Sequence, residues 1–242
     1  MKEIKPISLV YSILLFLIPG IVFYFNINFL VPFLAKISGW TPYLVWIMTG
    51  TLFLFLPLFL LTFLLLKKDG FTLDWSTIKD RLMLKRINIQ DIMWIIIGMI
   101  ICTLISVLLI GFWKLFSPSF DINELKEMSP IKVNPLVGKE RFALIFLPIF
   151  YFFNYVGEEF MWRGYILPRQ ILAFGKYSWP LNMILHVVFH MAFSLKALLF
   201  FIPFMLFLPY IVYKRKNTYL SIIIHFLLGA PTQLFVALGI FI

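Results

Sequence analysis

Apolar side chains dominate this chain in long runs, and short segments rich in lysine and arginine separate the runs. The runs cover about 8–32, 42–66, 91–116, 142–165, 179–194, 197–213 and 218–240. About 20 mostly apolar residues let a helix cross the hydrocarbon core of a bilayer. The pattern therefore predicts an all-α, polytopic transmembrane helical bundle of about seven spans, forming a single membrane domain over 1–242.

The polar segments between the runs differ in character. The segment 67–90 mixes basic and acidic residues with Trp75, which is typical of an amphipathic piece lying on the membrane surface. The segment 117–141 is the most polar part of the chain. Three predicted spans fall within 1–116 and four within 142–240.

Composition supports a membrane protein and excludes several other classes. The chain is 62% hydrophobic and 13% charged, whereas soluble domains carry about 25% charged residues. The net charge of +10 comes from lysines and arginines at span ends, so it does not indicate a nucleic-acid partner. One cysteine excludes an intrachain disulfide and a cysteine-held cofactor, and we expect no cofactor.

The distribution of basic residues predicts the orientation in the membrane. Most of the 21 lysines and arginines fall on the side of the N-terminus, if Arg163, Arg169 and Lys176 mark a basic turn after the fourth span. Cytoplasmic loops carry an excess of such residues. We expect a multi-pass protein of a bacterial-type plasma membrane, with the N-terminus cytoplasmic and the C-terminus outside.

Two adjacent carboxylates, Glu158 and Glu159, stand near the end of the fourth run. An ionised side chain at the bilayer centre costs at least about 2.5–3.5 kcal/mol, so these residues have a partner or a reaction. On a helix, Glu159 and Arg163 share a face at i and i+4, while Glu158 points about 100° away. One carboxylate can be neutralised while the other stays available for chemistry. The alternative is a buried ion-pair cluster that holds two helices together.

All three histidines, His186, His190 and His225, also lie in predicted spans. We expect a polar site between spans four, five and seven. A glutamate and a histidine can deprotonate a water, and a second histidine can stabilise the oxyanion that forms when this water attacks an amide. Alternatively, Glu158, His186 and His190 bind zinc. The sequence His-Val-Val-Phe-His lacks the glutamate of a His-Glu-x-x-His motif, so zinc ranks second.

The motif Glu158-Glu159-x-x-x-Arg163, followed by a histidine in the next span and another in a later span, resembles the CPBP (CAAX protease and bacteriocin-processing, or Abi) family. Its members are intramembrane glutamic endopeptidases, and the wording here resembles a bacterial branch. The resemblance covers about 142–229 and implies a catalytic core over 142–240. It implies hydrolysis of a membrane-embedded or lipidated peptide or protein, in contact with membrane lipid. Roles in bacteriocin immunity or peptide maturation follow from the same resemblance.

The resemblance also assigns roles. Glu158 and His190 would activate the hydrolytic water, and His225 would help to stabilise the oxyanion. Glu159 and Arg163 would complete the first motif.

Two positions depart from the family pattern. His186 stands where an aromatic residue is usual, and it either adds a hydrogen bond beside His190 or makes an interhelical contact. Gly229 stands where an asparagine is usual, and the loss of one oxyanion donor typically costs about 100- to 1,000-fold in rate. Asn182 and Gln233 are candidate substitutes for the missing amide. The alternative function is a catalytically inactive membrane scaffold or regulator that keeps the fold.

Overall fold

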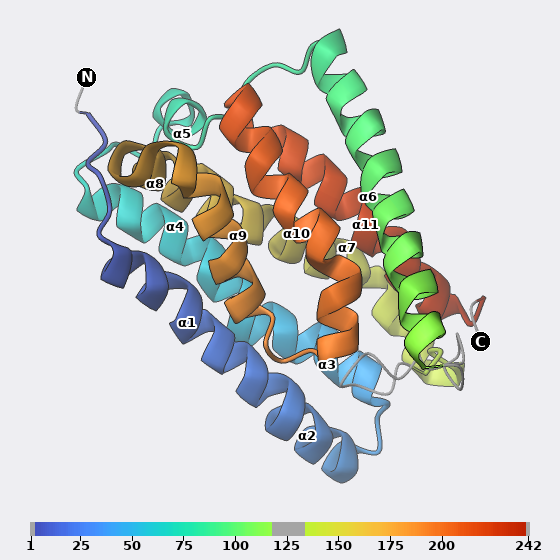
Figure 1. The fold of residues 1–242 in the computed structure, drawn as a ribbon. Helices are drawn as coiled ribbons and strands as arrows, with labels where there is room; N and C mark the ends of the chain where they lie inside the picture. Colours follow the sequence, from blue (N-terminus) through green and yellow to red (C-terminus); the bar gives the residue numbers. More distant parts are fainter. Residues whose placement is uncertain (1–2, 118–133, 241–242) are drawn as a thin grey trace.

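A computed structural model describes residues 3–117 and 134–240, and within these ranges the chain is helical without strands (Figure 1). Among the described residues, five helices are long and apolar enough to cross a membrane, or six if a bent pair, Gly138–Ile145 and Leu147–Phe189, is one span. The predicted all-α polytopic bundle is confirmed, and the chain is a multi-pass membrane protein. Within 3–117 and 134–240 the candidate spans thus number five or six, against the expected seven or so.

The N-terminal half holds three long helices. The first, Leu9–Ser38, consists of α1 (Leu9–Phe25), a π-helical segment (Asn26–Leu30) and α2 (Val31–Ser38), and the second, Pro42–Lys68, of α3 (Pro42–Gly50), a π-helical segment (Thr51–Phe55) and α4 (Leu56–Lys68). The third is α6 (Ile89–Phe116).

Local sequence explains where these helices start and stop. Gly39 ends the first at φ +71°, and the Thr41 side chain then caps the second, which has Pro42 in its first turn. Asn88 and Asp91 form a reciprocal capping box at the start of α6.

The segment between α4 and α6 contains one short surface helix, α5 (Trp75–Arg81). The Asp74 side chain caps α5 by accepting a hydrogen bond from the Thr77 N–H. Hydrogen bonds from Thr72, Thr77 and Ser76 lower the pKa of the Asp74 carboxyl. The segment is therefore held in an ordered helical turn, as its amphipathic pattern predicts.

One continuous helix, 147–174, crosses the middle of the bundle, and we call it the central helix. It consists of α7 (Leu147–Tyr151), a π-helical segment (Phe152–Gly157), Glu158 and Glu159, a second π-helical segment (Phe160–Ile166) and α8 (Leu167–Phe174). Gly175, at φ +55°, ends it.

The central helix runs past the expected end of span four at about residue 165. Arg163 does not mark a basic turn, because its guanidinium is buried in an ion pair with Glu159. Arg169 pairs with Asp69 and stacks over the Tyr165 ring at 3.6 Å. The two glutamates consequently lie near the middle of a helix rather than near its end.

The expected fifth span is too short to cross a bilayer by itself. It is α9 (Ser178–Phe189), whose 12 residues rise about 18 Å against the roughly 30 Å of a hydrocarbon core. A turn at 190–193 follows α9 and leads into α10 (Leu195–Arg215), which Ser194 caps. The short helix α9 thus ends inside the bundle with His190 at its C-terminus.

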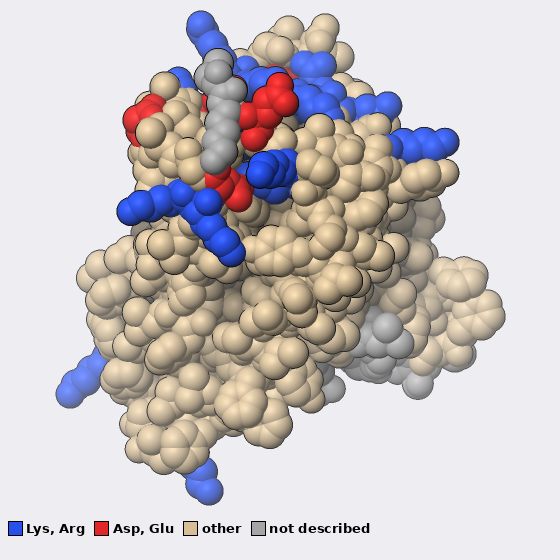
Figure 2. Space-filling model, turned by 90° about the vertical axis from the view of Figure 1, so that its left-hand side faces the viewer, with Lys and Arg blue, Asp and Glu red and all other residues tan. Residues whose placement is uncertain are grey.

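The central helix and α9 each contact helices from both halves of the chain. The helix α9 packs between α1 and α10, and α10 also contacts α6 and the last helix, α11 (Thr218–Leu238). The central helix contacts α4 on one side and α11 on another. The termini lie at opposite ends of the molecule (Figure 1). Charged side chains gather at the end that carries α5 and the N-terminus, and few lie elsewhere on the face in Figure 2.

Candidate active site

Glu158 and Glu159 form the centre of a buried polar cluster. They lie between the two π-helical segments of the central helix, and π-bulges inside α-helices frequently occur at functional sites. Their exposed fractions are 2% and 0%. Gly157 allows this helix to approach the Pro42–Lys68 helix closely, since a Cβ there would lie 3.1 Å from the Phe55 carbonyl oxygen. Two carboxylates are therefore held side by side, away from bulk water.

Glu159 binds two cationic or polar partners with a single oxygen. Arg163 Nη1 donates to Glu159 Oε1 over 3.1 Å, which is the contact expected from their i, i+4 spacing. His225 Nδ1, on α11, lies 3.0 Å from the same oxygen. Because a carboxylate accepts, Nδ1 of His225 carries the proton and Nε2 faces away from Glu159. Glu159 thereby fixes the position of both partners.

Arg163 also fixes the tautomer of His186. Its Nη2 lies 3.0 Å from His186 Nδ1, and a guanidinium only donates, so this nitrogen accepts. The proton of neutral His186 is therefore on Nε2, which lies 3.3 Å from Glu158 Oε2 and donates to it. A chain of hydrogen bonds thus runs from Glu159 through Arg163 and His186 to Glu158.

His190 presents a free nitrogen to the same site. Its Nδ1 donates to the His186 carbonyl over 3.1 Å, which leaves the lone pair on Nε2. The rings of His186 and His190 are nearly perpendicular, with centroids 4.6 Å apart. One ligand-type atom from each of Glu158, His186 and His190 lies within 4.8 Å of the others. The three residues therefore converge, and an acid and a basic nitrogen face a common point.

The same three residues are the alternative zinc site, and their hydrogen bonds do not suit it. A zinc ligand needs a lone pair directed at the metal. If His186 Nε2 offered one, its Nδ1 would carry a proton and point this proton at the Arg163 guanidinium, donor against donor. The arginine therefore opposes the three-ligand arrangement.

We expect purified protein to contain far less than one zinc ion per chain, because of this donor–donor conflict. Metal analysis by mass spectrometry checks this, with Arg163→Met as a comparison because it removes the conflicting donor. One tightly bound zinc per wild-type chain would contradict the assignment.

The two amides proposed as substitutes lie elsewhere in the network. Asn182 Nδ2 donates to the Trp162 carbonyl at 3.1 Å and to Gln170 Oε1 at 2.9 Å, so both of its N–H groups are engaged. It joins α9 to the central helix. Gln233 follows His225 by eight residues, about 12 Å along α11. The structure thus brings together Glu158, Glu159, Arg163 and all three histidines, but not Asn182 or Gln233.

One residue of the site, Tyr155, is missed by the sequence analysis. Its ring contacts that of His225 edge-on, with centroids 4.9 Å apart, and its exposed fraction is 2%. Its hydroxyl oxygen is buried and has no hydrogen-bond partner among the described residues. The available signal is its position four residues before Glu159 on the same helix.

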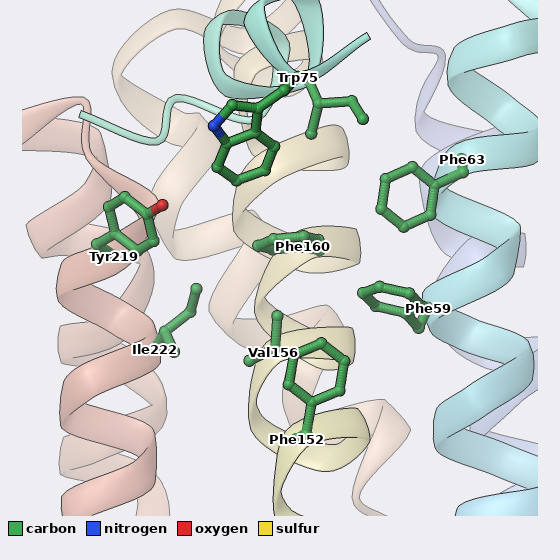
Figure 3. Close-up of a pocket in the computed structure, with 9 residues that line it drawn as sticks. Phe59, Phe63, Trp75, Phe152, Val156, Phe160, Tyr219 and Ile222 are labelled. Atoms are coloured by element: carbon green, nitrogen blue, oxygen red, sulfur yellow. The ribbon is translucent and has the colours of Figure 1, made fainter. Parts of the chain in front are cut away.

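An apolar groove runs along the same helices that carry Glu159 and His225. Its volume is about 330 Å³, and it lies between α11 and α4, with the central helix between them and Trp75 above (Figure 3). Its lining residues are Phe59, Phe63, Trp75, Ile78, Phe152, Val156, Phe160, Tyr219 and Ile222.

Two lining residues of the groove are near neighbours in sequence of the polar site. Phe160 directly follows Glu159, and Ile222 precedes His225 by one turn. His225 is also the more accessible member of the Glu159–His225 pair, with 18% of its side chain exposed. The groove is therefore lined by the same two helices that carry Glu159 and His225.

Comparison with known families gives a match within the C-terminal half of the chain. Residues 140–230 match the family of type II CAAX prenyl endopeptidase Rce1-like proteins, a segment that includes every residue of the cluster around the two glutamates. No curated protein and no solved structure matches the chain.

Proposed function

We propose that the chain is an intramembrane endopeptidase, because its residues 140–230 match the type II CAAX prenyl endopeptidase Rce1-like family. The observation that carries the proposal is the convergence of Glu158, His186 and His190 beside the Glu159–His225 pair. This arrangement supplies a base, a hydrogen-bonding histidine and a second histidine for the oxyanion within one buried site.

The proposed reaction begins with a water between Glu158 and His190. The lone pair of His190 Nε2 accepts a hydrogen bond from the water, while Glu158 takes the other proton. The water oxygen then forms a bond to the substrate carbonyl carbon, and the carbonyl oxygen becomes an oxyanion. On collapse the C–N bond breaks, and Glu158 returns its proton to the amine nitrogen. His186 orients Glu158 throughout by donating to Oε2.

The position of His225 supports it as the oxyanion partner. Glu159 holds the ring by its Nδ1 over 3.0 Å, so the Nε2 side of the ring is the part that is left to face an oxyanion. Glu159 and Arg163 are accordingly positioning residues.

We propose a membrane-embedded or lipidated peptide or protein as the substrate, since the groove between α4, the central helix and α11 is apolar and aromatic. An alkyl or prenyl chain, or an apolar helix segment, fits such a lining. Peptide maturation and bacteriocin immunity are the biological roles that the family resemblance favours.

We propose that the protein lies in the plasma membrane with its N-terminus in the cytoplasm and its C-terminus outside. The charged end of the molecule then faces the cytoplasm, as its basic residues favour (Figure 2). We expect a thiol at Lys68→Cys to react with a membrane-impermeant reagent from the cytoplasmic side, and one at Lys139→Cys from the outside. Both positions are exposed, and Cys102→Ala removes the buried native thiol. Labelling of position 68 from the outside and of position 139 from the cytoplasmic side would contradict the proposed orientation.

The test of the function compares peptide termini in membranes that contain equal amounts of wild-type protein or Glu158→Gln. The proposal expects a set of termini found with wild type and missing with the variant, and these termini identify the substrate. Identical sets, with the variant folded, would instead favour the second candidate, an inactive scaffold. The observation that favours this second candidate is Gly229, which offers no side-chain donor to an oxyanion.

A further inference from the structure

The place that a side chain at position 229 would occupy is already filled. A Cβ on Gly229 would lie 2.3 Å from the Tyr155 hydroxyl oxygen and 2.8 Å from its Cζ, far closer than atoms pack. Position 229 follows His225 by one helical turn on the same face of α11. The Tyr155 hydroxyl therefore lies beside His225, in the space that opens because residue 229 is glycine.

The state of this hydroxyl sets it apart from its neighbours. Tyr151 donates to the Ala230 carbonyl at 3.2 Å, and Tyr43 donates to the Gln233 carbonyl at 3.0 Å. Both of these tyrosines bind the backbone of α11. The Tyr155 hydroxyl is buried against the same helix and has no partner among residues 3–117 and 134–240. Buried polar groups normally have a hydrogen-bond partner, so a buried hydroxyl that lacks one requires an explanation.

We infer that Tyr155 is a catalytic residue that donates a hydrogen bond to the oxyanion, together with His225. This inference rests on the proposed function. A phenol O–H held in a dry site is a strong donor, and it needs no reorganisation when the charge forms. The oxyanion accepts this hydrogen bond while the tetrahedral intermediate exists, and no proton is transferred to it. The Tyr155 hydroxyl thus has no acceptor in the resting site, and the oxyanion formed during the reaction becomes its acceptor.

Two further contacts place Tyr155 for this role. Its ring packs edge-on against His225, so the two side chains are held in contact. It also precedes Glu159, the partner of His225, by four residues on the central helix. Gly229 is then a requirement of the site rather than a lost donor, because any side chain there would displace the phenol ring.

The test uses single hydroxyl deletions in reconstituted vesicles with the peptide substrate identified from the termini. We expect Tyr155→Phe to lower kcat by about 100- to 1,000-fold with KM unchanged, as for the loss of one oxyanion donor. Tyr151→Phe is the matched control: it loses a backbone hydrogen bond and keeps kcat. The thermal midpoint of Tyr155→Phe should equal that of wild type, because the deleted hydroxyl has no partner to lose.

An exchange of side chains provides a second arm. Gly229→Asn alone should lose activity, since its Cβ collides with the Tyr155 phenol. Gly229→Asn combined with Tyr155→Ala should be more active than Tyr155→Ala alone. A wild-type kcat in Tyr155→Phe, or a lowered thermal midpoint of this variant, would overturn the inference. The proposed function would still stand if Glu158→Gln is inactive. Absence of cleavage by the wild-type protein would overturn both.

Discussion

Glu158→Gln and Glu159→Gln are expected to fail in different ways, although the two residues are adjacent. Glu158→Gln keeps the shape of the side chain and an acceptor for His186, so the fold should survive. It removes the base, and general-base catalysis is worth about 100- to 10,000-fold. We expect at least this loss in kcat with an unchanged thermal midpoint.

Glu159→Gln should reduce activity and stability together. The carboxylate accepts from both Arg163 and His225 with its Oε1, and its loss leaves the buried guanidinium without its ion-pair partner. Such a loss is strongly destabilising. Rates and thermal midpoints in detergent, measured for both variants, distinguish the two roles. Asp80→Asn, at an exposed carboxylate, is the control that should match wild type. Equal effects at positions 158 and 159 would contradict the assignment of one base and one positioning residue.

Arg163→Met is the second change with a large expected effect. The guanidinium is fully buried and bridges Glu159 Oε1 and His186 Nδ1. Removing one partner of a buried ion pair typically costs about 3–5 kcal/mol, because the other charge stays buried and unpaired. We expect a large fall in the thermal midpoint and loss of hydrolysis, since His186 loses the donor that fixes its tautomer.

Two further variants separate charge from geometry at this position. Arg163→Lys retains the positive charge but lacks the planar fork that reaches both partners, so we expect stability to recover more than activity. Arg163→Met combined with Glu159→Gln removes both charges, and its midpoint should exceed that of Arg163→Met alone. A double variant less stable than either single variant would show that the pair is not the source of the effect.

The sequence predicts most of the scaffold because bilayer physics is simple. Runs of apolar residues long enough to cross a membrane identify the long helices, and the i, i+4 spacing correctly predicts that Glu159 pairs with Arg163. Hydropathy is less informative about helix ends. The apolar run containing α9 continues to residue 194, whereas the helix ends after Phe189. From sequence alone, Arg163 resembles the basic residues that mark the ends of membrane spans, whereas the structure shows it buried against Glu159.

The details of the site depend on contacts between distant segments. No sequence signal announces the π-helical segments on either side of Glu158 and Glu159, because they follow from packing of the central helix. The His186 tautomer is set by an arginine on another helix. The Tyr155 ring fits beside α11 only because Gly229, far along the chain, has no side chain. Three-dimensional proximity, rather than residue type, gives these positions their roles.

The central claim is that Glu158 activates a water for peptide hydrolysis, and isotope labelling in vesicles tests it most directly. Wild-type protein and Glu158→Gln are incubated with the substrate in water enriched in oxygen-18, and new C-termini are analysed by mass spectrometry. We predict new C-termini carrying one oxygen-18 atom with wild type and none with the variant. Labelled termini produced equally by both proteins, or none by wild type, would contradict the claim.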